Sequence, residues 1–165
     1  MSLSNHPYRY FTAPEEFLTL WGELLRKLAG DRLCQVWAVW DEIAEGWFED
    51  APMLVQLSSG TLSVNVSCEN KLAAGWDDIL HTDRPVWFDE RQRIAEKMDC
   101  WSEDLSWREY TPVKQAFGGV VEEIIPVTDS FGLRGLNFLL SDGASLRIEN
   151  TGDEITGQFV PAQKN

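Results

Sequence analysis

Residues 53–66 read MLVQLSSGTLSVNV, in which two alternating apolar runs flank a short turn containing Ser59 and Gly60. A two-residue loop at residues 59 and 60 pairs apolar side chains across the two runs: Leu57 with Leu62, Val55 with Val64, and Met53 with Val66. These pairs all fall on one face, and the opposite face is polar except for Leu54. The pattern predicts an antiparallel hairpin that is buried on one side.

A second stretch, residues 136–155, reads LNFLLSDGASLRIENTGDEI and repeats this pattern of two apolar runs around a turn that contains glycine. A two-residue loop at residues 142 and 143 would place Phe138 opposite the polar Arg147. A loop one residue longer, residues 142–144, restores apolar pairs between Phe138 and Ile148 and between Leu140 and Leu146. We therefore predict a three-residue connection or a bulge at Gly143.

Each hairpin follows a strand-like segment, RLCQVWAVWDEI at residues 32–43 and VVEEIIPV at residues 120–127. Trp37 and Trp40 are separated by an odd number of residues, so we expect them on opposite faces of the first segment. An internal duplication, residues 31–80 and 119–155, explains the similarity of the two units. Independent occurrence of the common sequence pattern of β-hairpins explains this similarity equally well.

The N-terminal part has the pattern of an amphipathic helix. Thr12 and Glu15 form a capping-box pattern around Pro14, and Gly30 is a stop signal. The apolar residues between them recur at helical spacing (Phe17, Leu20, Trp21, Leu24, Leu25 and Leu28). Residues 89–101 predict a second, central helix, and residues 104–110 a short strand.

The sequence therefore predicts a single α+β domain over residues 1–165. Its antiparallel sheets are built from two similar strand-hairpin units and are packed by the N-terminal helix and the central helix.

The net charge of -13 disfavours binding to nucleic acid and to anionic membranes, and it suits a basic protein partner. The three cysteines contain no Cys-x-x-Cys pair, and residues 1–17 contain no secretion signal. No apolar run is long enough to span a bilayer. We expect a cytoplasmic protein with reduced thiols.

The motifs indicate no catalytic centre. Asp77 and His81 could share one face of a helix as two metal ligands, but a third ligand is missing, so solvated and capping aspartates are the simpler interpretation. There is no Gly-x-Ser-x-Gly elbow and no phosphate-binding Gly-rich loop. We predict no catalytic residues, no metal site and no cofactor.

One region combines acidic and aromatic residues. Residues 33–83 hold nine acidic residues and one basic residue, Lys71, which gives -8 of the total charge together with four Trp. WDEIAEGWFED, residues 40–50, is the densest part. Its acidic and Trp residues are the predicted partner-binding site (Trp40, Asp41, Glu42, Glu45, Trp47, Glu49 and Asp50). The alternative is that the Trp residues belong to the core and the acidic residues to a solvated loop.

The phrase NFLLSDGASLRIEN followed by Asp153 and Glu154, together with the acidity, resembles small bacterial proteins of the toxin-immunity type. This resemblance implies a non-catalytic protein whose acidic face neutralises a basic partner such as a nuclease. An alternative is a small-molecule-binding protein or enzyme with a Trp-lined pocket between the two sheet units. A homodimer that buries exposed Trp residues is a third possibility.

Overall fold

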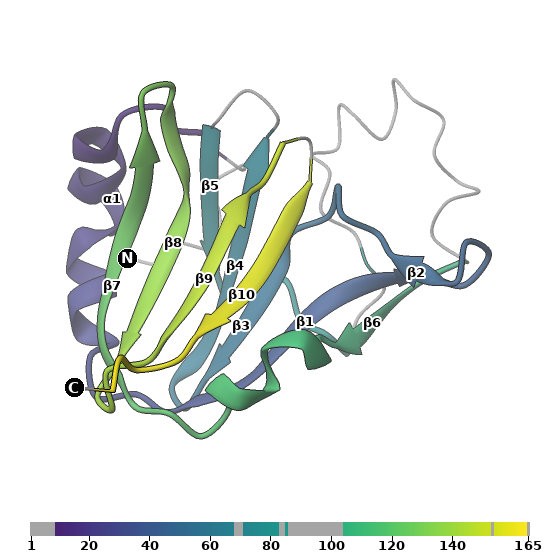
Figure 1. The fold of residues 1–165 in the computed structure, drawn as a ribbon. Helices are drawn as coiled ribbons and strands as arrows, with labels where there is room; N and C mark the ends of the chain where they lie inside the picture. The colour runs from purple at the N-terminus through teal and green to yellow at the C-terminus, as the bar shows by residue number, and fades with distance from the viewer. Residues whose placement is uncertain (1–8, 68–70, 83–84, 86–103, 153, 165) are drawn as a thin grey trace.

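The computed structural model describes residues 9–67, 71–82, 85, 104–152 and 154–164, and it shows a mixed α+β fold with two antiparallel sheets (Figure 1). In chain order the elements are α1 (Pro14–Lys27), β1 (Leu33–Asp41), β2 (Gly46–Trp47), β3 (Met53–Leu57), β4 (Gly60–Ser67), β5 (Lys71–Trp76), β6 (Leu105–Glu109), the 3-10 helix η3 (Thr111–Ala116), β7 (Val121–Asp129), β8 (Gly132–Leu140), β9 (Ser145–Asn150) and β10 (Ile155–Val160). The predicted fold class is confirmed. The predicted central helix, at residues 89–101, lies outside the described residues.

The larger sheet has six strands and the smaller sheet has four. The larger sheet runs β2-β1-β3-β4-β5, with β6 also paired to β1, and the smaller sheet runs β10-β9-β8-β7. Trp37 and Trp40 each have a partner on both sides, so β2 and β3 occupy one edge of β1 in succession and β6 occupies the other. Strand β6 confirms the short strand predicted at residues 104–110.

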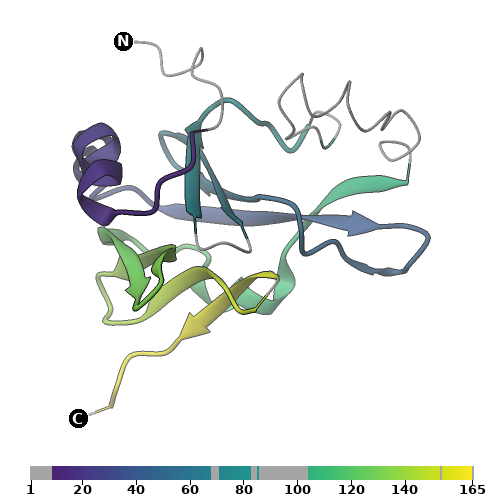
Figure 2. The same ribbon diagram turned by 90° about the horizontal axis from the view of Figure 1, so that it is seen from above.

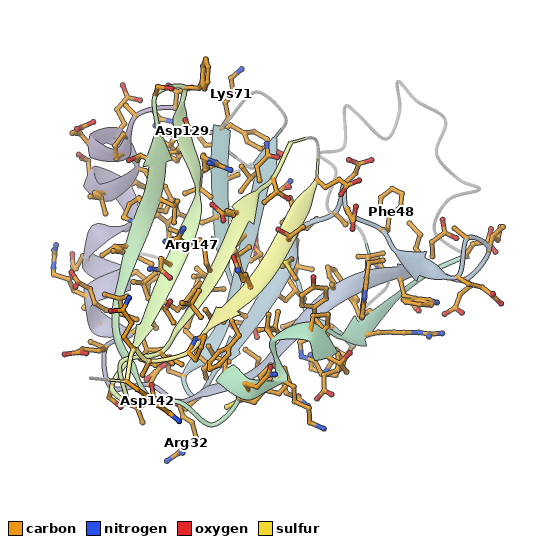
Figure 3. The ribbon with its side chains drawn as sticks, in the orientation of Figure 1. Arg32, Phe48, Lys71, Asp129, Asp142 and Arg147 are labelled. Atoms are coloured by element: carbon orange, nitrogen blue, oxygen red, sulfur yellow. The ribbon has the colours of Figure 1, made fainter. Side chains whose placement is uncertain are left out.

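The two sheets pack face to face, and the side chains between them form the main core (Figure 2). Val55 and Val64 from one sheet and Phe138 and Ile148 from the other are each 0% exposed. Side chains fill the space between the layers, and the labelled Asp129 and Asp142 mark opposite ends of the smaller sheet (Figure 3). The predicted buried faces of both hairpins are therefore correct.

The register of the first hairpin differs from the prediction by two residues. Val55, not Leu57, pairs with Leu62, and the loop is formed by Ser58 and Ser59. A shift of two residues keeps every side chain on its face. The shift follows from contacts outside the hairpin: the carboxylate of Asp31 accepts a hydrogen bond from the backbone N–H of Ser59 (3.2 Å). A Cβ on Gly60 would lie 2.3 Å from the ring of Trp76, so only glycine fits there.

The second hairpin has the predicted three-residue connection, but this connection is formed by residues 141–143. Leu140 N–H donates to Ala144 C=O (2.9 Å), and Gly143 N–H donates to Leu140 C=O (2.9 Å). Phe138 pairs with Leu146. The last residue of such a loop is left-handed, and Gly143 has a φ of 87°, so glycine rather than Ala144 takes that position.

Helix α1 lies beside β7 and covers one side of the sandwich (Figures 1 and 2). Phe17 and Trp21 stack with ring centroids 6.4 Å apart, and both are buried. Two details of the prediction are wrong. Ala13, not Thr12, is the N-cap, with no side-chain cap bond, and Leu20 is 38% exposed because the buried face is narrower than the apolar stripe. In the described part of the chain, no helix has the length and apolar character needed to cross a membrane.

A second apolar cluster covers the outer face of the larger sheet. It contains Val39, Ala51, Leu54, Ile79, Leu105 and Trp107. Trp37 packs against it and stacks on His81 at 4.0 Å with an interplanar angle of 3°, whereas Trp40 lies on the other face. The prediction of opposite faces for these two Trp residues is correct. The prediction that the first hairpin is buried on one side only is wrong, because Leu54 on the other face is 0% exposed.

The two units proposed from the sequence have similar strand orders. Strands β1, β3, β4 and β5 are successive antiparallel neighbours, and so are β7, β8, β9 and β10. The similar acidic segments of the two units occupy different positions relative to the strands. Residues 76–79 lie at and after the end of β5, whereas residues 152–155 lie before and at the start of β10. The duplication stays a prediction.

Candidate functional site

The predicted partner-binding residues lie where β1 runs beyond the smaller sheet. We use "the extension" for the end of β1 with β2 and β6, residues 37–47 and 105–109, which projects from the sandwich (Figures 1 and 2). Val36 and Ala38, on the inner face of β1, are buried (0% and 6% exposed). Trp40 continues the same face past the body of the sandwich and is only partly buried. The apolar inner face of β1 thus continues beyond the part that the smaller sheet covers.

The opposite face of the extension is part of the second apolar cluster. Val39, Leu105 and Trp107 pack there, and Phe48 lies beside the start of the extension (Figure 3). The backbone N–H of Phe48 donates to Val39 C=O (2.8 Å), which continues the pairing of β1 beyond β2. The extension is therefore fixed by packing on one face and displays its other face.

The displayed face carries a row of aromatic side chains. Trp40 pairs with Trp47 across the strands, and their rings meet edge to face at 5.2 Å and 87°. Trp47 in turn meets Tyr110 at 4.9 Å and 67°. A Cβ on Gly157 of β10 would lie 3.0 Å from the Tyr110 ring, so this glycine lets the row pack against the smaller sheet. Each ring of the row thus contacts the next in an edge-to-face arrangement, which is a favourable aromatic geometry.

Glu42 and Arg108 form an ion pair beside this row. Nη2 of Arg108 lies 2.9 Å from Oε1 and 2.8 Å from Oε2 of Glu42. The guanidinium carbon lies 4.7 Å from the centroid of the Trp40 ring, which is a cation–π contact. The hydroxyl of Ser106 also donates to Glu42 (2.8 Å). The Ser106 hydrogen bond, and then Arg108, lower the pKa of the Glu42 carboxyl below its ordinary value.

The tip of the extension is held by Asp41. Its Oδ1 accepts hydrogen bonds from the backbone N–H groups of Ile43 (2.8 Å) and Ala44 (3.0 Å), an Asx turn. Glu45 is exposed in a left-handed conformation (φ 53°), and Ile43 is 75% exposed. Asp41 thus shapes the turn, and Ile43 and Glu45 are displayed by it.

Glu49 and Asp50 lie on the linker from β2 to β3. The carbonyl of Glu49 accepts a hydrogen bond from Ile155 N–H (3.0 Å), which ties the linker to the smaller sheet. The hydrogen bond between the Glu49 and Glu154 carboxyl groups, followed by burial and the charges of Glu154 and Asp50, raises the pKa of Glu49 to about 7. Asp50 is exposed.

The structure therefore brings together Trp40, Glu42 and Trp47 and gives the other predicted residues different roles. Sequence reasoning missed Ser106, Arg108, Tyr110 and Glu154. The sequence predicts a strand at residues 104–110, and the alternation of this segment shows which of its side chains share a face. No local signal indicated that this strand pairs with β1, more than sixty residues earlier.

No three His, Cys, Asp or Glu side chains gather as a metal site in the part of the chain that the structure describes. Asp77 and His81 each have a structural contact. Asp77 accepts a hydrogen bond from Thr61 N–H (2.8 Å), and His81 stacks on Trp37. Asp77 lies in a bend after β5 and bonds to a strand residue, so the interpretation of this aspartate as a helix cap is wrong.

A groove of about 450 Å³ lies between α1 and β7. Leu18, Gly22 and Leu25 form its helical wall, and residues 122–126 form its other wall. No Trp lines this groove, and it does not lie between the two sheets, so it differs from the pocket considered as an alternative from the sequence.

In comparisons with protein-family models, with curated proteins and with solved structures, nothing matches this chain. The function must therefore be argued from the extension itself.

Proposed function

We propose that this chain is a non-catalytic acidic binding protein that uses the displayed face of the extension to bind a basic protein partner. The observation that supports this proposal most directly is the pair of contacting rings of Trp40 and Trp47, both only partly buried, with the carboxylate of Glu42 beside Trp40. Trp is enriched among the residues that dominate binding energy at protein interfaces, and these two Trp side chains are partly exposed. The surrounding carboxylates supply attraction over a distance.

The distribution of charge agrees with a basic partner. The segment that contains the extension's hairpin, residues 33–83, carries -8 of the net charge of -13. A field of this sign accelerates encounters with a cationic surface and suppresses encounters with anionic ones. In line with the resemblance to toxin-immunity proteins, we propose that the partner is a basic toxin that this chain neutralises in the bacterial cytoplasm.

Two double variants with the same charge change test which face binds. Glu45→Gln with Asp50→Asn removes two exposed carboxylates from the predicted binding segment at residues 40–50, one at the tip of the extension and one on the β2–β3 linker. Glu122→Gln with Glu123→Gln removes two exposed carboxylates from β7. We expect the first variant to weaken binding of a deca-arginine peptide by roughly fivefold at low salt and the second to change it little. Binding of the unmodified chain should fall steeply from about 50 mM to about 300 mM NaCl. Isothermal titration calorimetry measures both effects.

Equal weakening by the two variants would show that only net charge matters, and the proposal would then be wrong. Trp40→Ala and Trp47→Ala complete the test. We expect both variants to keep a folded circular-dichroism spectrum and to lose affinity for the peptide. Unfolding of both variants would show instead that these residues belong to the core.

A further inference from the structure

We propose that the ring of Trp40 and the carboxylate of Glu42 form a binding site for an arginine side chain of the partner, and that Arg108 occupies this site in the free protein. This inference rests on the proposed function and names the chemistry of the contact. The Trp40–Glu42 site combines an aromatic face with a carboxylate beside it, which is the pair of groups that a planar guanidinium binds best.

The site is preorganised by residues other than Arg108. The hydroxyl of Ser106 donates a hydrogen bond to Oε1 of Glu42 (2.8 Å), and the rings of Trp40 and Trp47 meet edge to face with centroids 5.2 Å apart. Both contacts come from strands paired with β1, so the carboxylate and the ring keep their places when a guanidinium leaves. A partner's arginine therefore meets a site that is already formed.

Arg108 is held in a way that allows its displacement. Only Nη2 contacts the carboxylate, bonding to both oxygens, so the two-nitrogen fork that arginine forms in its strongest carboxylate pairs is not made. The side chains of Arg108 and Glu42 are 47% and 45% exposed. Exposed ion pairs and exposed cation–π contacts are individually weak. We expect Arg108 to reduce the affinity of the site for an incoming guanidinium by about tenfold.

The main experiment compares Arg108→Gln with Arg26→Gln. Both variants remove one positive charge, but Arg26 is an exposed residue of α1, far along the chain from the extension. We expect Arg108→Gln to tighten binding of a deca-arginine peptide by about tenfold, or about 1.4 kcal/mol, and Arg26→Gln to change it by less than about twofold. A deca-lysine peptide should gain less than deca-arginine from Arg108→Gln, because an ammonium group can bind the freed Glu42 carboxylate but does not stack on Trp40 as a guanidinium does.

Two further measurements keep the test decisive if Arg108→Gln is poorly folded. Arg108→Lys keeps the charge and should give a smaller gain in affinity for deca-arginine. In the unmodified chain, the indole N–H resonance of Trp40, assigned with Trp40→Phe, should shift when deca-arginine is added.

The inference would be overturned by equal effects of Arg108→Gln and Arg26→Gln on deca-arginine binding, or by a Trp40 resonance that does not move. Such a result leaves the proposed function standing if Glu45→Gln with Asp50→Asn still weakens binding. Absence of any salt-dependent binding to either peptide would instead remove the proposed function itself.

Discussion

The acid–base behaviour of Glu49 is strongly altered by its surroundings. Its carboxyl group shares a hydrogen bond with that of Glu154, and two carboxylates in contact cannot both be charged without repulsion. The pKa of Glu49 is raised from an ordinary 4.5 to about 7 for this reason. The pair joins the β2–β3 linker to the loop before β10, next to the hydrogen bond from Ile155 N–H to Glu49 C=O. Protonation therefore strengthens the connection between the two sheets.

We expect the unfolding free energy to decrease as pH rises from about 4.5 to about 7, because the folded state binds the extra proton in this window and the unfolded state does not. This stabilisation is fully present below the unfolded pKa and is lost above about 7. Since Glu49 is only partly buried, solvent screening limits the effect to about 1 kcal/mol, or about 2–4 °C in Tm. Glu49→Gln should remove this part of the slope in thermal melts at several pH values. The control Glu122→Gln should keep the dependence of Tm on pH. A dependence of Tm on pH that is unchanged in Glu49→Gln would contradict the assignment.

The hairpins show which properties of an element are local. Their buried faces follow from a two-residue alternation, and the faces survived a register error of two residues in both hairpins. The register predictions failed at the turns. Gly60 is required there by the nearby ring of Trp76, and Gly143 by its left-handed backbone conformation. The clearest reversal concerns two leucines. Leu20 is exposed on α1 although it fits the apolar stripe, and Leu54 is buried although it lies on the polar face.

Substitution of these two leucines tests which faces of the larger sheet and of α1 are buried. We expect Leu54→Ala to lower the unfolding free energy by about 2–5 kcal/mol, because it creates a cavity in the second apolar cluster. Leu20→Ala should cost less than about 1 kcal/mol, since its side chain is 38% exposed. Urea unfolding of both variants measures the difference. The opposite ranking would mean that the outer face of the larger sheet is not covered as described.

The whole molecule carries a net charge of -13. Like charges repel more in the folded state than in the expanded unfolded chain. The same charges serve the proposed function by steering a basic partner toward the extension. The negative charges that attract a basic partner therefore also lower the stability of the free chain.

We expect Tm to rise by about 2–4 °C, corresponding to about 1 kcal/mol, when NaCl is raised from about 10 mM to about 500 mM. The reason is that the screening length falls from about 30 Å to a few Å. Differential scanning calorimetry measures the change. A smaller rise is expected for the variant with Glu122→Gln and Glu123→Gln, which carries less charge. A Tm that is constant or falls with salt would show that the self-repulsion is already compensated.

The sequence by itself determined the amphipathic helix, the two hairpins, their buried faces and the acidic–aromatic segment at residues 40–50, because each depends on side chains within a few turns or one hairpin of each other. Only the tertiary structure decided that β6 pairs with β1, that Arg108 reaches Trp40 and Glu42, and that Leu54 is covered. These contacts join segments far apart in the chain. They depend on how the sheets pack, which alternation along one strand does not encode.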